Sequence, residues 1–296
     1  MKIVEVGPRD GLQNEAVAVA LDAKVRLIEE LVEAGVRHVE CGSFVSPKWV
    51  PQMADTSSVF AKIRRVAGVS YSALVPNLQG LAEAARCGVE EIAVFASASE
   101  TFSQRNINCG IEESLNRLRV VVAEAKKHGM KVRGYVSCVL GCPYEGEIHL
   151  GSVLRVAAIL VDIGCYEVSL GDTIGVGTPR KAEEMLRFLS QGVPVKQLAV
   201  HFHDTWGQAL ANILASLEIG IETIDSSVAG LGGCPYAKGA SGNVATEDVV
   251  YMLDGLGVEA GIDLEKLAAA GRHIMHVLGR PSASKAALAL AALKEK

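Results

Sequence analysis

The sequence has no long basic block, no apolar run that approaches the length of a membrane span, and no C-x-x-C pair. Because the formal net charge is −5 and nucleic-acid binding needs a basic face, no nucleic-acid partner is expected. A membrane span needs roughly 18 apolar residues in a row, so no membrane association is expected either. Charged residues interrupt the start of the chain at Glu5, Arg9 and Asp10, which argues against a secretory signal.

The cysteines number seven, which is odd, and their spacing does not match a zinc ribbon. A disulfide framework is therefore not expected, and most of them are predicted to be buried thiols in a reducing cytoplasm. Apolar residues make up 49% and charged residues 21% of the 296 positions, a balance typical of a globular chain with a large core. Without a linker or a low-complexity segment, residues 1–296 are predicted to form a single domain.

Short apolar runs alternate along the chain with amphipathic helical stretches. Helix signals mark several boundaries: Asp22 is a candidate N-cap, Gly35 follows the end of the same helix, and Thr178 precedes Pro179. Strands are predicted over residues 2–6, 36–41, 69–75, 91–96, 131–139, 166–170, 195–202 and 222–228. Helices are predicted over residues 22–34, 54–66, 78–86, 112–128, 152–163, from 179 onward, 208–219 and 246–256.

Eight strand–helix units predict parallel strands with right-handed crossovers, closed into a barrel rather than left as an open sheet. We therefore expect an α/β fold, a (β/α)₈ TIM barrel over about residues 1–257. About residues 258–296 are predicted to form a helical extension, with helices near 264–278 and 284–293. These extra helices would cover part of the barrel or a partner subunit.

Polar side chains collect where the predicted strands end, which is where such barrels carry their catalytic groups. His201-x-His203 is the most informative pair, because residues two apart on a strand share a face. Two convergent imidazoles suit a divalent metal, although two hydrogen-bonded core histidines would have the same spacing. Asp10 and the Asn243 amide favour the metal, and this mixed set of oxygen and nitrogen ligands fits Mg²⁺ or Mn²⁺ with open positions.

Arg9 and Asp10 are adjacent, so in an extended backbone they would point apart, one toward a metal and one toward a substrate. A guanidinium at the barrel mouth can stabilise an enolate or carboxylate oxygen. Arg9 could instead form a structural pair with Glu40, and Glu40 could also orient Arg9 for catalysis. Asp172 follows strand six, where it could act in catalysis or bind the neighbouring backbone.

A glycine-rich segment follows strand eight, with five glycines in the fourteen residues 230–243. It lacks the Walker pattern, so a nucleotide-binding P-loop is excluded. We interpret it as a mobile lid that carries a thiol, because Cys234 there could protonate a carbanion-like product. The alternative is an inert loop thiol.

Five motifs together resemble the 3-hydroxy-3-methylglutaryl-CoA lyase family. They are E-V-G-P-R-D-G-L-Q-N-E at 5–15, S-F-V-S-P-K-W-V-P-Q-M-A-D at 43–55, G-D-T-I-G-V-G-T-P at 171–179, H-F-H-D at 201–204 and V-A-G-L-G-G-C-P-Y-A-K-G-A-S-G-N at 228–243. Related Claisen-type synthases share the Arg-Asp and His-x-His elements but typically carry Glu-Arg-Ala where this chain has Cys234-Pro-Tyr. The resemblance implies a TIM barrel that cleaves 3-hydroxy-3-methylglutaryl-CoA to acetyl-CoA and acetoacetate with Mg²⁺ or Mn²⁺.

The resemblance also assigns roles to individual residues. It implies that the metal is held by Asp10, His201, His203 and Asn243. It implies that the catalytic residues are Arg9, Cys234, Asp172 and Glu40. Substrate contacts are expected from Arg9, Gln13, Ser43 and Thr173. Asp172 and a histidine compete as the base that removes the hydroxyl proton, and a histidine already on the metal is the poorer base.

The family resemblance carries expectations about biology as well. An acyl-CoA is the expected small-molecule partner, a homodimer the expected assembly, and leucine degradation and ketone body formation the expected pathways. The chain starts one residue before the first predicted strand, so a cytoplasmic form is expected. The alternatives are a lyase or synthase for another acyl-CoA, and a catalytically silent barrel that acts as a scaffold and binds no metal.

Overall fold

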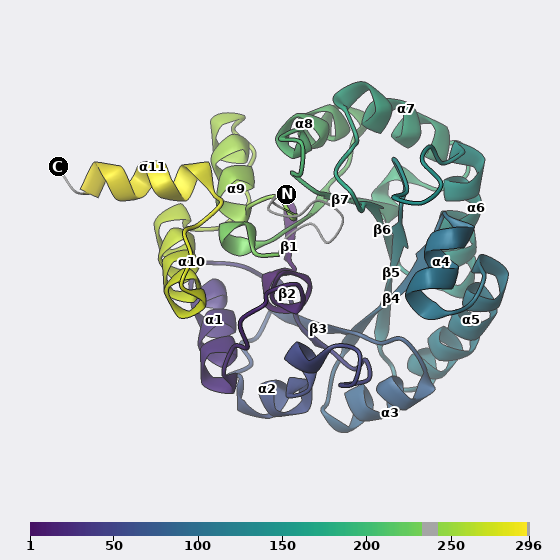
Figure 1. Ribbon diagram of the computed structural model, residues 1–296, viewed down its shortest axis with the longest axis horizontal. Coiled ribbons are helices and arrows are strands. Elements are labelled where there is room, and N and C mark those ends of the chain that lie inside the picture. The colour runs from purple at the N-terminus through teal and green to yellow at the C-terminus, as the bar shows by residue number, and fades with distance from the viewer. Residues whose placement is uncertain (233–241, 295–296) are drawn as a thin grey trace.

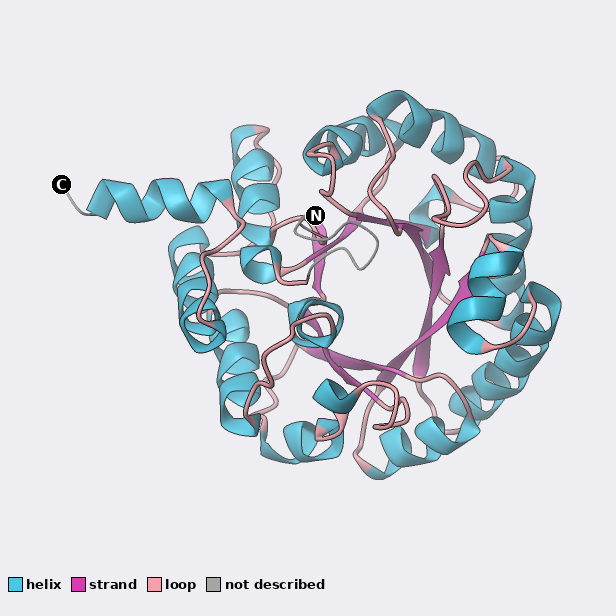
Figure 2. Ribbon diagram, in the orientation of Figure 1, coloured by secondary structure: helices cyan, strands magenta, loops and turns pink. Residues whose placement is uncertain are grey.

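The computed structural model describes residues 1–232 and 242–294, and eight parallel strands form a closed barrel inside a ring of helices (Figure 1, Figure 2). The strands follow one another around the barrel in chain order, and β1 pairs with β8 to close it. The expected (β/α)₈ barrel with extra C-terminal helices is confirmed. None of the helices formed by the described residues is long and apolar enough to span a bilayer.

The strands are short, and each one delivers its carboxyl end to the same rim of the barrel. They are β1 (Lys2–Glu5), β2 (His38–Ser43), β3 (Ser70–Leu74), β4 (Glu91–Ser97), β5 (Lys131–Ser137), β6 (Glu167–Asp172), β7 (Leu198–Phe202) and β8 (Thr223–Ser226). The α-helices are α1 (Leu21–Glu33), α2 (Thr56–Lys62), α3 (Leu78–Arg86), α4 (Glu100–Ile107), α5 (Ile111–Lys127), α6 (Leu150–Ile163), α7 (Pro179–Leu189), α8 (Ala209–Ile219), α9 (Thr246–Gly255), α10 (Leu264–Leu278) and α11 (Lys285–Lys294).

Several element boundaries differ from the prediction. The seventh strand begins at Leu198 rather than at 195, because Val195–Gln197 forms a 3₁₀ turn after Pro194. Helix α2 covers only Thr56–Lys62, where 54–66 was expected. Helix α4 was not predicted: its sequence is mostly polar and buries little more than Phe102, so it lacks a clear apolar stripe.

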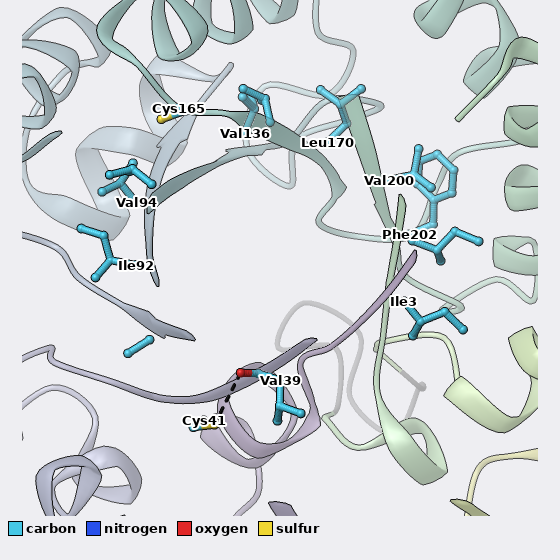
Figure 3. Packing of buried hydrophobic residues seen from close by; sticks show 14 of the residues in the cluster. Ile3, Val39, Cys41, Ile92, Val94, Val136, Cys165, Leu170, Val200 and Phe202 are labelled. Carbon is cyan, nitrogen blue, oxygen red and sulfur yellow. Dashed lines mark hydrogen bonds between the residues drawn. The ribbon is translucent and has the colours of Figure 1, made fainter. Parts of the chain in front are cut away.

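The main hydrophobic core lies between the strands and the helices. Figure 3 shows Ile92, Val94, Val136, Leu170 and Val200 on this outer side of the strands. Since side chains alternate along a strand, the residues between them face the barrel interior.

The barrel interior is rich in charge rather than in branched aliphatic residues. Arg133 on β5 donates to Asp225 on β8 and to Glu167 on β6, and all three side chains are buried. Lys2 on β1 also donates to Glu167 from the bottom of the barrel. Pairing satisfies each buried charge, so the strands are cross-linked through the inside of the cylinder.

The C-terminal extension contacts one sector of the barrel. Helix α10 packs against α1 and α9, and α11 projects away from the barrel wall (Figure 1). Between these helices, Arg280 reaches back to Glu15 in the segment after β1. The extension is therefore linked to the mouth of the barrel as well as to its outer helices.

Candidate active site

A turn of π-helix at Gly7–Gly11 directly follows β1 and places Arg9 and Asp10 at the mouth. The expectation that these two side chains point apart is wrong, because the backbone here is wound rather than extended. Nη1 of Arg9 instead donates to Oδ1 of Asp10. Gly11 is needed for close packing, since a Cβ there would lie 2.6 Å from Cβ of Leu231. The wound turn is the local structure that aims Asp10 into the mouth.

The two histidines at the end of β7 converge with Asp10. Nε2 of His201 lies 3.3 Å from Nε2 of His203 and 3.9 Å from Oδ2 of Asp10. One ligand atom from each of the three residues lies within 4.8 Å of the others. Donor atoms around a six-coordinate Mg²⁺ or Mn²⁺ are separated by roughly 3–4 Å, so this set can hold a divalent metal.

Asn243 completes the group from the far side of the glycine-rich segment. It pairs with His203 through a backbone bridge, and its amide nitrogen donates to Oδ2 of Asp10 over 2.9 Å. The four residues predicted as metal ligands thus lie together, three of them nearly buried, on three different segments.

The electrostatics of the group suit a cation. Burial alone would raise the pKa of Asp10, but the charges of Arg9 and His201 outweigh it and lower this pKa to about 2. Burial together with the charge of His201 lowers the pKa of His203 to about 4. At neutral pH the site therefore offers an ionised carboxylate and a neutral imidazole, which are the ligand forms that bind metal.

Arg9 is held rigidly by the barrel interior. Its Nε donates to Oε2 of Glu40 over 2.8 Å, and its guanidinium lies 5.4 Å from the centre of the Tyr135 ring. The Tyr135 hydroxyl donates to the same Glu40 oxygen over 3.1 Å. Oε1 of Glu40 is buried and has no hydrogen-bond partner in the described part of the chain. Burial raises the pKa of Glu40 despite the Arg9 charge.

Sequence reasoning missed Asp225, which stands directly behind His201. Its Oδ2 lies 3.3 Å from Nδ1 of His201 and accepts from Ser169 over 2.7 Å, while Arg133 binds both carboxylate oxygens. Burial alone would raise the pKa of Asp225, yet Arg133 and His201 hold it well below its usual range. Asp225 therefore fixes the ring orientation of His201 with Nε2 toward the mouth.

Asp172 lies at the end of β6 and faces its own loop. Its two oxygens accept from the backbone amides of Val176 over 3.2 Å and Gly177 over 2.8 Å. Burial raises its pKa to about 6 even though these hydrogen bonds lower it. Of the two roles that the sequence allowed for Asp172, catalysis or binding of the neighbouring backbone, the hydrogen bonds show the second. The neighbouring Thr173 hydroxyl accepts from the amide of Cys138 over 2.8 Å.

The other predicted substrate contacts differ in their surroundings. Oε1 of Gln13, just after the π-helical turn, is buried without a hydrogen-bond partner among the residues that the structure describes. Ser43 is buried, and its hydroxyl donates to the carbonyl of Leu74 over 3.4 Å. Gln13 therefore has an acceptor to offer a ligand, whereas Ser43 already uses its hydroxyl proton.

Cys234 lies in residues 233–241, outside the described residues. The flanking residues are well anchored: Gly242 donates to the carbonyl of Gly232 over 3.1 Å. The Gly232 amide in turn donates to Oε1 of Glu15 over 3.1 Å, and Arg280 pairs with the same carboxylate. Both ends of the segment are thereby fixed beside Asn243.

The fold and site define a (β/α)₈-barrel enzyme with a candidate metal centre at the carboxyl ends of its strands. The HMGL-like family model matches residues 1–274, and the chain belongs to this family. A hydroxymethylglutaryl-CoA lyase structure from Pseudomonas aeruginosa is similar, with a TM-score of 0.97 and 57% identity over 98% of this chain and 97% of that one.

Two curated relatives match almost the whole chain. The 3-hydroxy-3-isohexenylglutaryl-CoA/hydroxy-methylglutaryl-CoA lyase of Pseudomonas aeruginosa is 57% identical over 99% of this chain and 97% of its own length. The mitochondrial hydroxymethylglutaryl-CoA lyase of Arabidopsis thaliana is 60% identical over 98% of this chain. The chain spans 62% of the length of that plant protein.

Proposed function

We propose that this protein is a metal-dependent carbon–carbon lyase that cleaves 3-hydroxy-3-methylglutaryl-CoA to acetyl-CoA and acetoacetate. The observation that carries the proposal is the convergence of Asp10, His201 and His203 beside the buried Arg9 guanidinium. A metal held by a carboxylate and imidazoles keeps coordination positions open for substrate, and the Arg9 guanidinium beside it supplies a fixed positive charge. Both suit the cleavage of a hydroxylated thioester. The lyases named above, at 57–60% identity, support the same reaction.

The reaction is a retro-Claisen cleavage. The tertiary hydroxyl gives its proton to a base, for which Asp172 and a histidine are the candidates, and the bond between the carbinol carbon and the thioester α-carbon breaks. The electron pair of that bond passes to the thioester, which leaves as an enolate. Protonation of the α-carbon gives acetyl-CoA, and the carbinol carbon becomes the ketone of acetoacetate.

We assign the metal to Asp10, His201, His203 and Asn243, with Mg²⁺ or Mn²⁺ as the ion. A bound divalent cation lowers the pKa of a hydroxyl group that it contacts, which favours loss of the tertiary hydroxyl proton. The Asn243 amide would present its oxygen to the cation, since an amide nitrogen cannot bind one.

Arg9 is assigned to the enolate oxygen. Its guanidinium is already oriented by Glu40 and Tyr135, so it needs no rearrangement when negative charge develops. Cys234 is assigned to protonation of the α-carbon, and the Gln13 carboxamide to a polar contact with the substrate. Asp172 also holds the 172–177 loop, because both of its oxygens accept from backbone amides there.

The test is product formation by the purified full chain, first stripped with EDTA and then loaded with Mg²⁺ or Mn²⁺. We expect equal amounts of acetyl-CoA and acetoacetate with either metal and none with EDTA. His203→Ala should lose both metal binding and turnover. Folded, metal-loaded protein that releases neither product would overturn the proposal.

Another acyl-CoA is the second candidate substrate. The Pseudomonas aeruginosa relative is named for a 3-isohexenyl substrate as well as the 3-methyl one. Cleavage of either compound would use the same bond and yield acetyl-CoA, so a comparison of the two separates the candidates. The dimer, the cytoplasmic location and the roles in leucine degradation and ketone body formation stay predictions.

A further inference from the structure

The barrel mouth has an apolar side opposite its charged residues. Leu74 on β3, Ala93 and Phe95 on β4, and Tyr135 on β5 form a small hydrophobic cluster separate from the main core. We call these four residues the apolar wall. Three of them are buried, whereas Phe95 is partly exposed.

The apolar wall faces the barrel interior. Neighbouring residues of a parallel pair point to the same side of the sheet, and Phe95 pairs with Tyr135 while Ala93 pairs with Arg133. Arg133 donates from inside the barrel to the Tyr135 hydroxyl and to Asp225 across the lumen. The alternate residues Ile92, Val94 and Val136 lie on the outer side (Figure 3).

Tyr135 places the apolar wall next to the reacting groups. Its ring centre lies 6.1 Å from the His201 ring and 5.4 Å from the Arg9 guanidinium carbon. The rings of Tyr135 and His201 meet edge to face, at 87°. A molecule bound between Arg9 and His201 would therefore have the apolar wall at its side.

The proposed substrate also has polar groups and one apolar group, which match the charged side of the mouth and the apolar wall. Of the groups on the carbinol carbon, the hydroxyl, the carboxylate arm and the thioester arm all need polar partners. The alkyl group alone gains free energy by leaving water, about 0.8 kcal/mol for each buried CH₂. Phe95 is the member of the wall with exposed ring surface, so an alkyl group can cover it.

We propose that the apolar wall binds the alkyl substituent on the carbinol carbon, and that the Phe95 ring limits the length of this substituent. This inference rests on the proposed function. The polar groups of the substrate then lie toward Arg9 and His201, which orients the bond that breaks. Beyond Phe95 and Tyr135, the same two strands end in the small paired residues Ser97 and Ser137.

The test compares kcat/KM for substrates that carry hydrogen, methyl, ethyl or butyl at the carbinol carbon. All four release acetyl-CoA, so one assay follows the whole series. Phe95→Ala should raise the butyl-to-methyl ratio of kcat/KM by about tenfold or more, because the removed ring frees space for the longer chain. Phe95→Leu should give an intermediate ratio, and Phe95→Trp should lower it.

Phe188→Ala is the matched control, because Phe188 is also partly buried but lies on the outer helix α7. It should leave the ratio unchanged. A ratio that stays constant across the folded Phe95 variants would overturn the inference while leaving the lyase proposal intact. No acetyl-CoA from any of the four substrates with wild-type protein would instead overturn the proposed function.

Discussion

Asp225 shows how one buried side chain can serve two neighbours at once. Its carboxylate neutralises Arg133 and also accepts from Nδ1 of His201. A carboxylate behind a histidine fixes the tautomer that leaves Nε2 free for a metal. The residue acts through His201, so it is a positioning residue.

Asp225→Asn should weaken Mn²⁺ binding about 10- to 100-fold, because the amide holds the imidazole less firmly and with no charge. Mn²⁺ binding to EDTA-stripped protein can be followed by electron paramagnetic resonance, with circular dichroism to confirm folding. Ser169→Ala is the control, since it removes only the 2.7 Å hydrogen bond that Ser169 donates to the same oxygen. An unchanged Mn²⁺ affinity in folded Asp225→Asn protein would contradict this role.

Much of the site was predictable from residue type and position. The pairs Arg9-Asp10 and His201-x-His203 lie at or just after the carboxyl ends of strands, and their chemistry is visible in the sequence. Asp225 was missed because the eighth strand was predicted over 222–228, which placed this residue in the middle of the strand, whereas β8 ends at Ser226. A signal did exist: charged residues such as Arg133 and Asp225 alternate with apolar residues in buried strands, which indicates a polar barrel interior.

Among the secondary-structure elements, the π-helical turn and α4 follow the carboxyl ends of strands, whereas the displaced start of β7 lies at the opposite end of the barrel. The π-helical turn at Gly7–Gly11 has no sequence signature, and the close approach of Gly11 to Leu231 that accompanies it is a tertiary contact. Helix α4 has few apolar residues, and the start of β7 is displaced by a 3₁₀ turn. The regular β/α units, with strong apolar periodicity, were predicted to within about two residues at each end. The expected N-cap was wrong for α1, where Asp22 lies in the first turn and Ala20 precedes the helix.

The connection from the C-terminal extension to the segment after β8 also has a testable role. Arg280 pairs with Glu15, which accepts from the Gly232 amide two residues before Cys234. Arg280→Met should lower kcat about tenfold. Without Arg280, Glu15 would hold Gly232 less firmly, and the Cys234 thiol would be less well placed for the reaction. Mn²⁺ affinity should stay unchanged, because Arg280 contacts none of the three clustered ligands.

Lys181→Met is a matched control for this change, because Lys181 forms an exposed ion pair with Glu147 far from the extension. Steady-state kinetics gives kcat, and the Mn²⁺ titration described above gives the affinity. Wild-type kcat in Arg280→Met would show that the Glu15 connection does not matter for turnover.

Two buried carboxyl groups connect the pH of the solution to the stability of the whole molecule. Glu5 binds the amides of Gly7 and Val228, and Glu247 binds the amide of Ala229, where β1, β8 and α9 meet. Burial raises the pKa of Glu5 to about 7 and that of Glu247 to about 8, from an ordinary 4.5. Between the ordinary pKa of 4.5 and the raised values of about 7 and 8, these two groups hold more protons in the folded state than in the unfolded state. The free energy of unfolding therefore falls as pH rises from about 5 to 8.

Glu247→Gln should flatten this decline by at least about 1 kcal/mol, because the amide keeps an acceptor for Ala229 and has no proton to lose. Urea unfolding at several pH values in EDTA measures the slope. Glu218→Gln, at an exposed position on α8, should leave the slope as in wild type. A Glu247→Gln protein with the wild-type slope would show that this carboxyl does not control the decline.

The charged barrel interior has a consequence for how such a protein can change over evolutionary time. Arg133, Glu167 and Asp225 join strands inside the cylinder, while the apolar mass that drives folding lies outside it. Replacing a whole buried ion group with apolar residues of similar volume is often neutral for stability, whereas losing one partner is costly. Lineages that exchange these interior residues together can therefore acquire new reactions at the mouth while the outer shell preserves the fold.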